Sequence, residues 1–309
     1  MGTLRTWAMA ARPRTLPAAV APVLVGSAAA WAVLNRDLPG DSRGYVLDFS
    51  RDFSWPLFVA ALIGAIFLQI GTNLANDYSD AKRGADTVDR LGPVRITASG
   101  LAAPRRVLHA TWAAFGVACL AGIYLTVEVG PEMFAIGLVS IIAGALYTGG
   151  PRPYGYEGLG EVVVFVFFGL VAVNGSYYVQ LEDLDALPMW LSIPVGLLSA
   201  AVLVVNNVRD IDTDRRAGKR TLAVRIGRER ARTVYVAMIA ASFALLPIAL
   251  LAGDGSAWGL LGLLSLPLAL EPVRAVRERT DGPALNGALA GTGALLGAFA
   301  LLVSIGLLI

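Results

Sequence analysis

Long apolar runs recur along the whole chain, and they limit its possible folds more than any other feature. A run of about 20 apolar residues can cross a bilayer as a helix, which satisfies its own backbone polar groups in hydrocarbon. A soluble all-α protein would have to expose several of these runs to water. We therefore expect an all-α membrane protein, residues 1–309 forming a single domain. About nine spans are expected, at residues 15–34, 55–76, 107–127, 132–148, 160–179, 188–207, 231–252, 256–273 and 284–308.

Charged residues are scarce and unevenly placed. They make up 16% of the chain, against about 25% in ordinary soluble domains. With nine spans, 22 of the 25 Lys and Arg residues fall on one side, in the N-terminus and at 77–106, 149–159, 208–230 with Arg232, and 274–283. Basic loops remain in the cytoplasm. We therefore expect a multi-pass protein of a prokaryotic inner membrane, with its N-terminus and charged loops cytoplasmic.

Acidic and amide side chains gather where the second expected span ends. Four of them lie at positions i, i+3, i+4 and i+7: Asn73, Asn76, Asp77 and Asp80. This spacing predicts one face of a helix that continues out of the membrane. Asp86 follows on a turn or a new element. An ionisable residue at the bilayer centre costs about 2.5–3.5 kcal/mol, so such a cluster must lie at the interface or line a wet cavity.

The end of the sixth expected span repeats this arrangement. Its members are Asn206, Asn207, Asp210 and Asp214. Asp212 lies between the two aspartates but off their shared face. Basic residues follow both clusters: Lys82 and Arg83 after the first, and Arg215, Arg216, Lys219 and Arg220 after the second.

The two clusters together indicate binding of a metal-bound polyanion. Carboxylate and amide oxygens suit Mg²⁺, above all when a phosphate supplies further ligands. The basic side chains that follow can neutralise the remaining phosphate oxygens. Solvated helix ends, with acids paired to neighbouring bases, are the structural alternative. That alternative explains one cluster well, but it explains two matching faces at the same membrane level poorly.

Four segments of the chain carry a family resemblance. In order they are ARPRTLPAAVAPVLVG, NLANDYSDAKRGAD with GPVRITASG, YTGGPRPYGYEGLGE, and NNVRDIDTDRRAGKRTLAVRIG, within residues 11–227. Together they resemble the UbiA superfamily of intramembrane aromatic prenyltransferases, and the acidic segments look like its two aspartate-rich motifs. In that superfamily the third acid of the first motif often follows the second by four residues. Here the spacing from Asp80 to Asp86 is six, which departs from the pattern.

The resemblance implies a fold and a reaction. The fold would be nine helices around a central cavity, capped by the charged cytoplasmic loops. The reaction would move a polyprenyl group from polyprenyl diphosphate to an aromatic acceptor, with two Mg²⁺ ions. The chain is most similar to enzymes that prenylate 1,4-dihydroxy-2-naphthoate, with loss of carbon dioxide, in menaquinone synthesis. Acceptors of other branches, namely 4-hydroxybenzoate, homogentisate, haem or a glycerol-phosphate lipid, stay open.

Charge and resemblance together suggest a role for each polar residue of the two motifs. One Mg²⁺ is assigned to Asn76, Asp77 and Asp80, and a second to Asp210 and Asp214. The diphosphate is assigned to four basic residues, Lys82, Arg95, Lys219 and Arg220. Metal ions and Lys or Arg side chains aimed at a leaving diphosphate act where negative charge develops, which is where catalysis gains most.

The acceptor site is expected beside the GGPRP turn at 149–153. Its expected residues are Asn73, Tyr147, Arg152 and Tyr156, with Arg152 assigned to the acceptor carboxylate. The expected partners are polyprenyl diphosphate, an aromatic acceptor and the lipid bilayer, and nucleic acid is not expected. A transporter is the alternative from another class. Transport sites, however, usually lie near the bilayer midplane, whereas both clusters lie at one edge.

Overall fold

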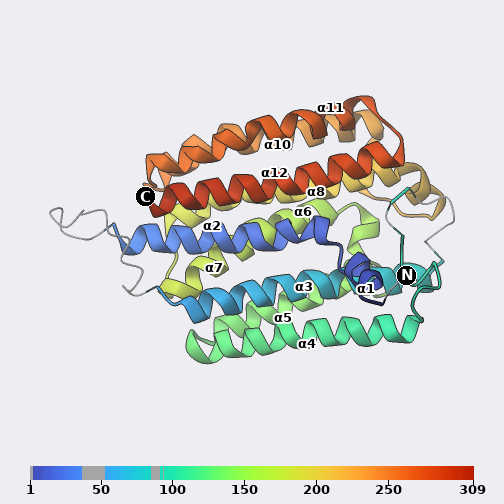
Figure 1. Cartoon of the computed structure of the whole chain (residues 1–309), viewed down its shortest axis with the longest axis horizontal. Helices are drawn as coiled ribbons and strands as arrows, with labels where there is room; N and C mark the ends of the chain where they lie inside the picture. Colours follow the sequence, from blue (N-terminus) through green and yellow to red (C-terminus); the bar gives the residue numbers. More distant parts are fainter. Residues whose placement is uncertain (1–2, 37–52, 85–90, 93) are drawn as a thin grey trace.

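The long helices run nearly parallel to one another (Figure 1). This computed structural model describes residues 3–36, 53–84, 91–92 and 94–309. In chain order the elements are α1 Thr3–Ala11, the 3-10 turn η1 Pro13–Thr15, α2 Leu16–Leu34, α3 Trp55–Lys82, α4 Pro104–Glu128, α5 Pro131–Leu146, the 3-10 turn η2 Tyr154–Glu157, α6 Gly160–Val164, the π-helical η3 Phe165–Val171, α7 Ala172–Leu181, α8 Ala186–Arg216, α9 Leu222–Ile226, α10 Arg228–Ala252, the 3-10 helix η4 Ala257–Ala269, α11 Leu270–Glu278 and α12 Gly282–Leu308.

Helices α2 and α8 form the centre of the bundle. Helix α2 packs against α12, α7 and α3, and α8 packs against α10, η3 and α12. Small residues let α2 approach its neighbours closely. A Cβ atom on Gly26 would lie only 2.1 Å from the Val173 carbonyl oxygen of α7. Any larger residue at this position would therefore push α2 and α7 apart.

The outward faces of the bundle are apolar. Leu120, Val127, Leu251, Leu264 and Leu270 are among its exposed side chains. Within the described residues, eight helical segments are long and apolar enough to cross a membrane. Because such faces are stable only against hydrocarbon, the protein is a multi-pass membrane protein, as the sequence predicts.

One expected span is shorter in the structure than a bilayer requires. Helix α5 has 16 residues, or about 24 Å at about 1.5 Å per residue, against a hydrocarbon core of about 30 Å. The total of nine spans therefore stays a prediction. The segment expected at 256–273 is a helix of mixed type, formed by η4 and α11.

The fifth expected span is not a regular α-helix. It consists of α6, the π-helical η3 and α7. At its centre, a Cβ on Gly169 would lie 2.8 Å from the Cα of Gly196 in α8, so the two backbones touch. A π-helical turn inserts an extra residue and often marks a functional site. Here η3 carries Phe167 and Phe168 into the wall of a cavity.

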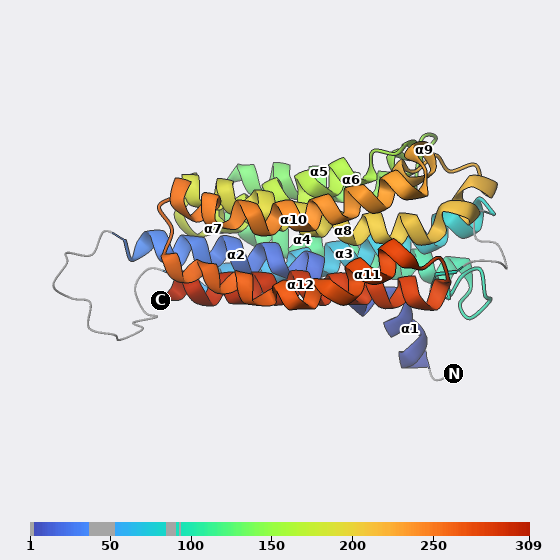
Figure 2. The same ribbon diagram turned by 90° about the horizontal axis from the view of Figure 1, so that it is seen from above.

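The expected charged connections lie together at one end of the bundle (Figures 1 and 2). The N-terminus and the connections α3–α4, α5–α6, α8–α10 and α11–α12 meet there, and we refer to this as the charged end. The C-terminus lies at the opposite end. The charged end therefore brings together the two acidic helix ends that the sequence separates by more than 100 residues.

Candidate active site

A polar pocket lies at the charged end, between the last turns of α3 and α8. Both acidic clusters contribute to it, together with the loops at 147–156 and 217–221. Its lining residues are Asn76, Asp80, Arg95, Tyr147, Thr148, Gly155, Tyr156, Asn206, Asn207, Asp210, Asp214, Lys219 and Thr221. The predicted meeting of the two clusters around one cavity is therefore present in the structure.

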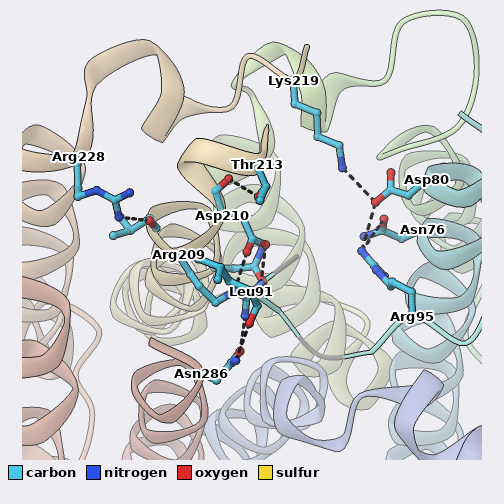
Figure 3. Close-up of polar contacts among 12 residues, drawn as sticks. Asn76, Asp80, Leu91, Arg95, Arg209, Asp210, Thr213, Lys219, Arg228 and Asn286 are labelled. Atoms are coloured by element: carbon cyan, nitrogen blue, oxygen red, sulfur yellow. Dashed lines mark hydrogen bonds and ion pairs between the residues drawn. The ribbon is translucent and has the colours of Figure 1, made fainter. Parts of the chain in front are cut away.

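Asp80 is the most heavily contacted acid of this pocket. Its side chain is 1% exposed. Arg95 Nη2 lies 3.2 Å from Asp80 Oδ2 and Lys219 Nζ lies 3.1 Å from the same oxygen, as Figure 3 shows. The hydroxyl of Tyr156 donates to Asp80 Oδ1 at 2.5 Å. Since a buried carboxylate is costly without partners, these three donors compensate for the burial of the Asp80 side chain.

Asp77 faces a different direction, although it belongs to the same expected helix face. Its two oxygens accept hydrogen bonds from the backbone N–H groups of Ile96 and Thr97, each at 3.0 Å. It is not part of the lining of the polar pocket. Arg95 immediately precedes these two amides, so Asp77 holds the loop that carries Arg95 into the pocket.

Asp210 forms the centre of a second network, drawn in Figure 3. Arg209 donates to both its oxygens, from Nε at 2.8 Å and from Nη2 at 2.6 Å. The same guanidinium donates to Asn206 on α8 and to Asn286 on α12, each at 2.8 Å. Asn286 in turn donates to the Leu91 carbonyl at 2.9 Å. This bidentate pair is buried, with Arg209 only 1% exposed.

The other two acids of the second motif lie in different places, as the sequence predicts. Asp214 lines the polar pocket. Asp212 is exposed and pairs with Arg228 at 2.6 Å, away from the pocket. Asp86 lies outside the described residues.

Three of the basic residues assigned from the sequence lie outside the pocket lining. Lys82, Arg152 and Arg220 are exposed, and the lining residues do not include them. Lys82 ends α3 two residues after Asp80, and Arg220 follows Lys219, so both lie at the rim. The structure thus brings Arg95 and Lys219 into the pocket but leaves Arg152 on the outer turn.

The tyrosines link the polar pocket to a deeper cavity. Tyr147 lines both spaces, and Tyr154 lines the deeper one. Their ring centroids lie 5.5 Å apart in an edge-to-face arrangement. Burial raises the pKa of Tyr154 above its ordinary value, so its hydroxyl stays protonated and donates to the Ala143 carbonyl at 2.8 Å.

That deeper cavity, which we name the chamber, has a volume of about 160 Å³ and is enclosed by α2, α3, α5, α6, η3, α8 and α12. It shares Asn76, Arg95, Tyr147 and Asn206 with the polar pocket. At its other side it shares Leu68, Gln69, Ser140, Phe167 and Phe168 with an apolar cavity of about 170 Å³. The apolar cavity extends between α2, α3, α4, α5 and α7 to Val179. Three adjoining spaces thus lead from charged to apolar surroundings, and the predicted central cavity is confirmed.

Asn73, expected at the acceptor, also lines the chamber. Its Nδ2 donates to the Ala11 carbonyl at 3.1 Å and to Thr15 Oγ1 at 3.2 Å. The amide therefore holds the turn between α1 and α2 against α3.

The family follows from comparison with known sequences. Residues 42–289 match the UbiA prenyltransferase family, well over half of the chain. The chain belongs to the UbiA family. This confirms the resemblance seen in the sequence motifs.

Curated UbiA relatives align with this chain over nearly its full length. A Mycobacterium tuberculosis protein named 1,4-dihydroxy-2-naphthoate octaprenyltransferase is 42% identical over 305 residues, covering 98% of this chain and 97% of that one. The Escherichia coli protein of the same name is 38% identical over 301 residues, covering 94% and 92%.

A solved UbiA structure shares the fold. The Archaeoglobus fulgidus UbiA homolog bound to GPP and Mg²⁺ superposes with a TM-score of 0.62 at 15% identity, covering 97% of this chain and 99% of that one. The likeness shows that the described helices adopt the UbiA arrangement.

The polar pocket has a donor set that suits the Mg²⁺ of UbiA enzymes. Asn76, Asp80, Asp210 and Asp214 offer oxygen atoms, which hard cations prefer. Among the described residues, no three Asp, Glu, His or Cys side chains gather into a ready-made metal site. The pocket therefore fits a metal that arrives with a phosphate, since phosphate oxygens complete its coordination.

Among the described residues, two buried charged side chains of this UbiA chain received no role from the sequence. Arg209 carries no distinguishing signal in the sequence, since a base next to an aspartate resembles an ordinary surface pair. Glu161, 3% exposed, accepts a hydrogen bond from Asn207 Nδ2 at 2.8 Å. Its position at the start of an expected span, where a carboxylate is costly, is the signal that could have singled it out.

Proposed function

We propose that the protein transfers a polyprenyl group from polyprenyl diphosphate to 1,4-dihydroxy-2-naphthoate, releasing diphosphate and carbon dioxide and giving demethylmenaquinol. One observation carries the proposal: the polar pocket, the chamber and the apolar cavity adjoin in that order. A lipid-tailed diphosphate likewise changes from charged at its headgroup to apolar along its tail. The names of the curated relatives supply the acceptor.

The diphosphate occupies the polar pocket in this proposal. Arg95 and Lys219 bind its oxygens directly, and Lys82 and Arg220 approach from the rim. In the structure Arg95 and Lys219 hold Asp80. When the diphosphate arrives, it takes over these two cations, and the carboxylate of Asp80 becomes available to a metal ion. Arg95 and Lys219 thereby exchange one anionic partner for another, and the carboxylate of Asp80 exchanges its cations for the metal ion.

Magnesium would be held by Asn76 and Asp80 on α3 and by Asp210 and Asp214 on α8. When bound, Mg²⁺ neutralises the negative charge that gathers on the leaving diphosphate. Two ions would match the two groups of ligands, one on α3 and one on α8. Asp77 acts as a positioning residue, because both its oxygens already accept backbone hydrogen bonds.

The prenyl group reacts in the chamber. The C–O bond to diphosphate breaks, a C–C bond forms to the aromatic ring, and loss of carbon dioxide returns an electron pair to the ring. An allylic cation must be kept from water, which apolar walls achieve. Phe167, Phe168, Tyr147 and Tyr154 line the chamber, and aromatic faces stabilise nearby positive charge. The prenyl tail lies in the apolar cavity, where each buried CH₂ contributes about 0.8 kcal/mol.

The charged end faces the cytoplasm in this proposal. Its support is the excess of Lys and Arg in the connections that meet there. The diphosphate headgroup and Mg²⁺ would then reach the polar pocket from the cytoplasmic side.

The test is a reconstituted reaction. Purified protein in nanodiscs receives Mg²⁺, a polyprenyl diphosphate and one of several aromatic acceptors, and products are analysed by mass spectrometry. We expect a prenylated product from 1,4-dihydroxy-2-naphthoate that lacks one carbon dioxide and disappears with EDTA. A product only from 4-hydroxybenzoate or homogentisate would refute the acceptor. No product from any acceptor, from protein that binds the diphosphate, would refute prenyl transfer.

A further inference from the structure

Arg12 lies at the junction of two cavities. It lines the chamber, and it also lines a neighbouring cavity formed with Arg14, Arg209 and Asn286 beside η1 and α12. Among the residues that the structure describes, the basic side chains lining the chamber are Arg12 and Arg95. Arg95 donates to Asp80 and Asn76 and also lines the polar pocket. Arg12, by contrast, enters the chamber away from the polar pocket, from the connection between α1 and α2.

The backbone at Arg12 adopts a conformation that only a local constraint would maintain. Its φ of 54° and ψ of 68° lie in the left-handed region, which is uncommon for a residue other than glycine. Such residues persist where the surrounding structure holds them, often at functional sites. The left-handed turn directs the chain from α1 into η1, so it sets the position from which the Arg12 side chain projects.

Side-chain hydrogen bonds help to hold this turn. Thr15 Oγ1 donates to the Arg12 carbonyl at 3.0 Å. Asn73 of α3 donates to the carbonyl of Ala11 at 3.1 Å and to Thr15 Oγ1 at 3.2 Å. The turn is thereby tied to the helix that carries Asn76 and Asp80. Arg12 is held at a set position relative to the reacting end of the donor.

The acceptor needs a cation in this space. Both substrates of the proposed reaction are anions, and the polar pocket already matches the diphosphate. A carboxylate that enters an apolar chamber loses hydration, which is costly unless a cation pairs with it. Arginine matches a carboxylate with two parallel hydrogen bonds. Arg152, the residue expected for this role from the sequence, is exposed on the outer turn.

On the basis of the proposed function, we propose that Arg12 binds the carboxylate of the aromatic acceptor and thereby selects carboxylated acceptors. Asn73 takes part indirectly, because it positions the turn. The neighbouring cavity offers the acceptor a route that does not pass through the diphosphate pocket.

The test compares two acceptors that give the same product, 1,4-dihydroxy-2-naphthoate and its decarboxylated form, 1,4-dihydroxynaphthalene. In Arg12→Gln the KM for the naphthoate should rise about 10- to 100-fold, as expected for a lost charge-assisted hydrogen bond. The KM for polyprenyl diphosphate and the rate with 1,4-dihydroxynaphthalene should stay within about twofold of wild type.

Arg12→Lys should bring the KM for the naphthoate part of the way back to the wild-type value. Arg5→Gln, the same change at an exposed site on α1, is the matched control and should match wild type.

A second variant separates binding from folding. Arg12→Gly suits the left-handed backbone better than arginine does, so its thermal stability should equal or exceed that of wild type. Its equilibrium binding of 1,4-dihydroxy-2-naphthoate, measured without donor or Mg²⁺, should nevertheless be lost. Unchanged naphthoate binding in Arg12→Gly, or equal KM increases for both substrates in Arg12→Gln, would overturn the assignment. Failure of the proposed function would look different, because wild-type protein itself would not prenylate the naphthoate.

Discussion

Asp77 and Asp80 show how neighbouring acids on one helix acquire different tasks. Both lie on α3 and both are almost fully buried. Asp80 meets side-chain cations and a phenol, partners that can move when a substrate arrives. Asp77 meets two backbone amides, which cannot move without unfolding the loop at 95–97. Because its partners can move, Asp80 can bind a metal and substrate. Asp77, whose partners are fixed, holds the structure of the loop.

Replacing Asp80 or Asp210 with Asn should abolish turnover, because each change removes a metal-binding charge from the polar pocket. We expect at least a 100-fold loss of kcat, about 2.7 kcal/mol at 1.36 kcal/mol per tenfold. Both variants should still fold, as judged by gel filtration, although Asp210→Asn should be less stable than wild type because the buried Arg209 loses its anionic partner. Asp212→Asn is the control, since Asp212 is exposed and pairs with Arg228 on the surface. Near-normal turnover in Asp80→Asn would contradict the metal assignment.

Asp77→Asn should act on donor binding through Arg95. An amide cannot accept both backbone hydrogen bonds with its two ends, so the loop at 95–97 loosens at a cost of roughly 1–3 kcal/mol. We expect a lower thermal midpoint and a higher KM for polyprenyl diphosphate, with Mg²⁺ dependence unchanged. A shift in the Mg²⁺ concentration needed for half-maximal rate, without loss of stability, would instead make Asp77 a metal ligand.

At the scale of elements, Arg209 joins parts of the chain that are far apart in sequence. From its place on α8, beside Asp210 and Asn206, it donates to Asn286 of α12, and Asn286 reaches the loop after α3 through the Leu91 carbonyl. The charged end is thus held together by polar contacts, whereas the rest of the bundle is held by apolar packing. A single guanidinium connects the second motif to the last helix.

Arg209→Met should destabilise the protein by about 3–5 kcal/mol, because it leaves Asp210 buried without its partner. The double variant Arg209→Met/Asp210→Asn should recover part of that loss, since no unpaired charge remains. Thermal unfolding in detergent measures both variants and the single variant Asp210→Asn, and the coupling energy is the loss in the double variant minus the sum of the two single losses. A coupling energy near zero would show that the pair contributes nothing to the fold.

At the scale of the whole molecule, the three adjoining cavities predict how donor length is selected. Ala65 lies on the apolar cavity but outside the chamber. Ala65→Phe should shorten the space for the tail and lower kcat/KM for long polyprenyl diphosphates about tenfold, the effect of losing roughly 1.4 kcal/mol of burial. A ten-carbon donor should react as before, because its tail is short. Val127→Phe, on the exposed face of α4, is the control, and an equal loss with both donors would argue against a tail site here.

Much of this architecture could be predicted from the sequence, because membrane helices follow strong local rules. Apolar run length predicted the helices, and the spacing of Asn73, Asn76 and Asp80 predicted a shared face. Loop charge predicted which connections meet at one end. The partner of each side chain could not be predicted, since the amides at 96 and 97 reach Asp77 only after the chain folds back. The left-handed turn at Arg12 and the π-helical η3 also depend on tertiary contacts that leave no periodic signal.

The adjoining cavities have a further consequence for where the products go. In the proposed reaction diphosphate is released at the polar, charged end, whereas the prenylated ring is attached to a tail that already lies among apolar helices. The two products therefore leave into different phases, and neither competes with the other for its exit. Partitioning of the quinol precursor into lipid also removes it from the reaction equilibrium. The protein would act as a phase-transfer catalyst, because its polar pocket and its apolar cavity adjoin inside the same bundle.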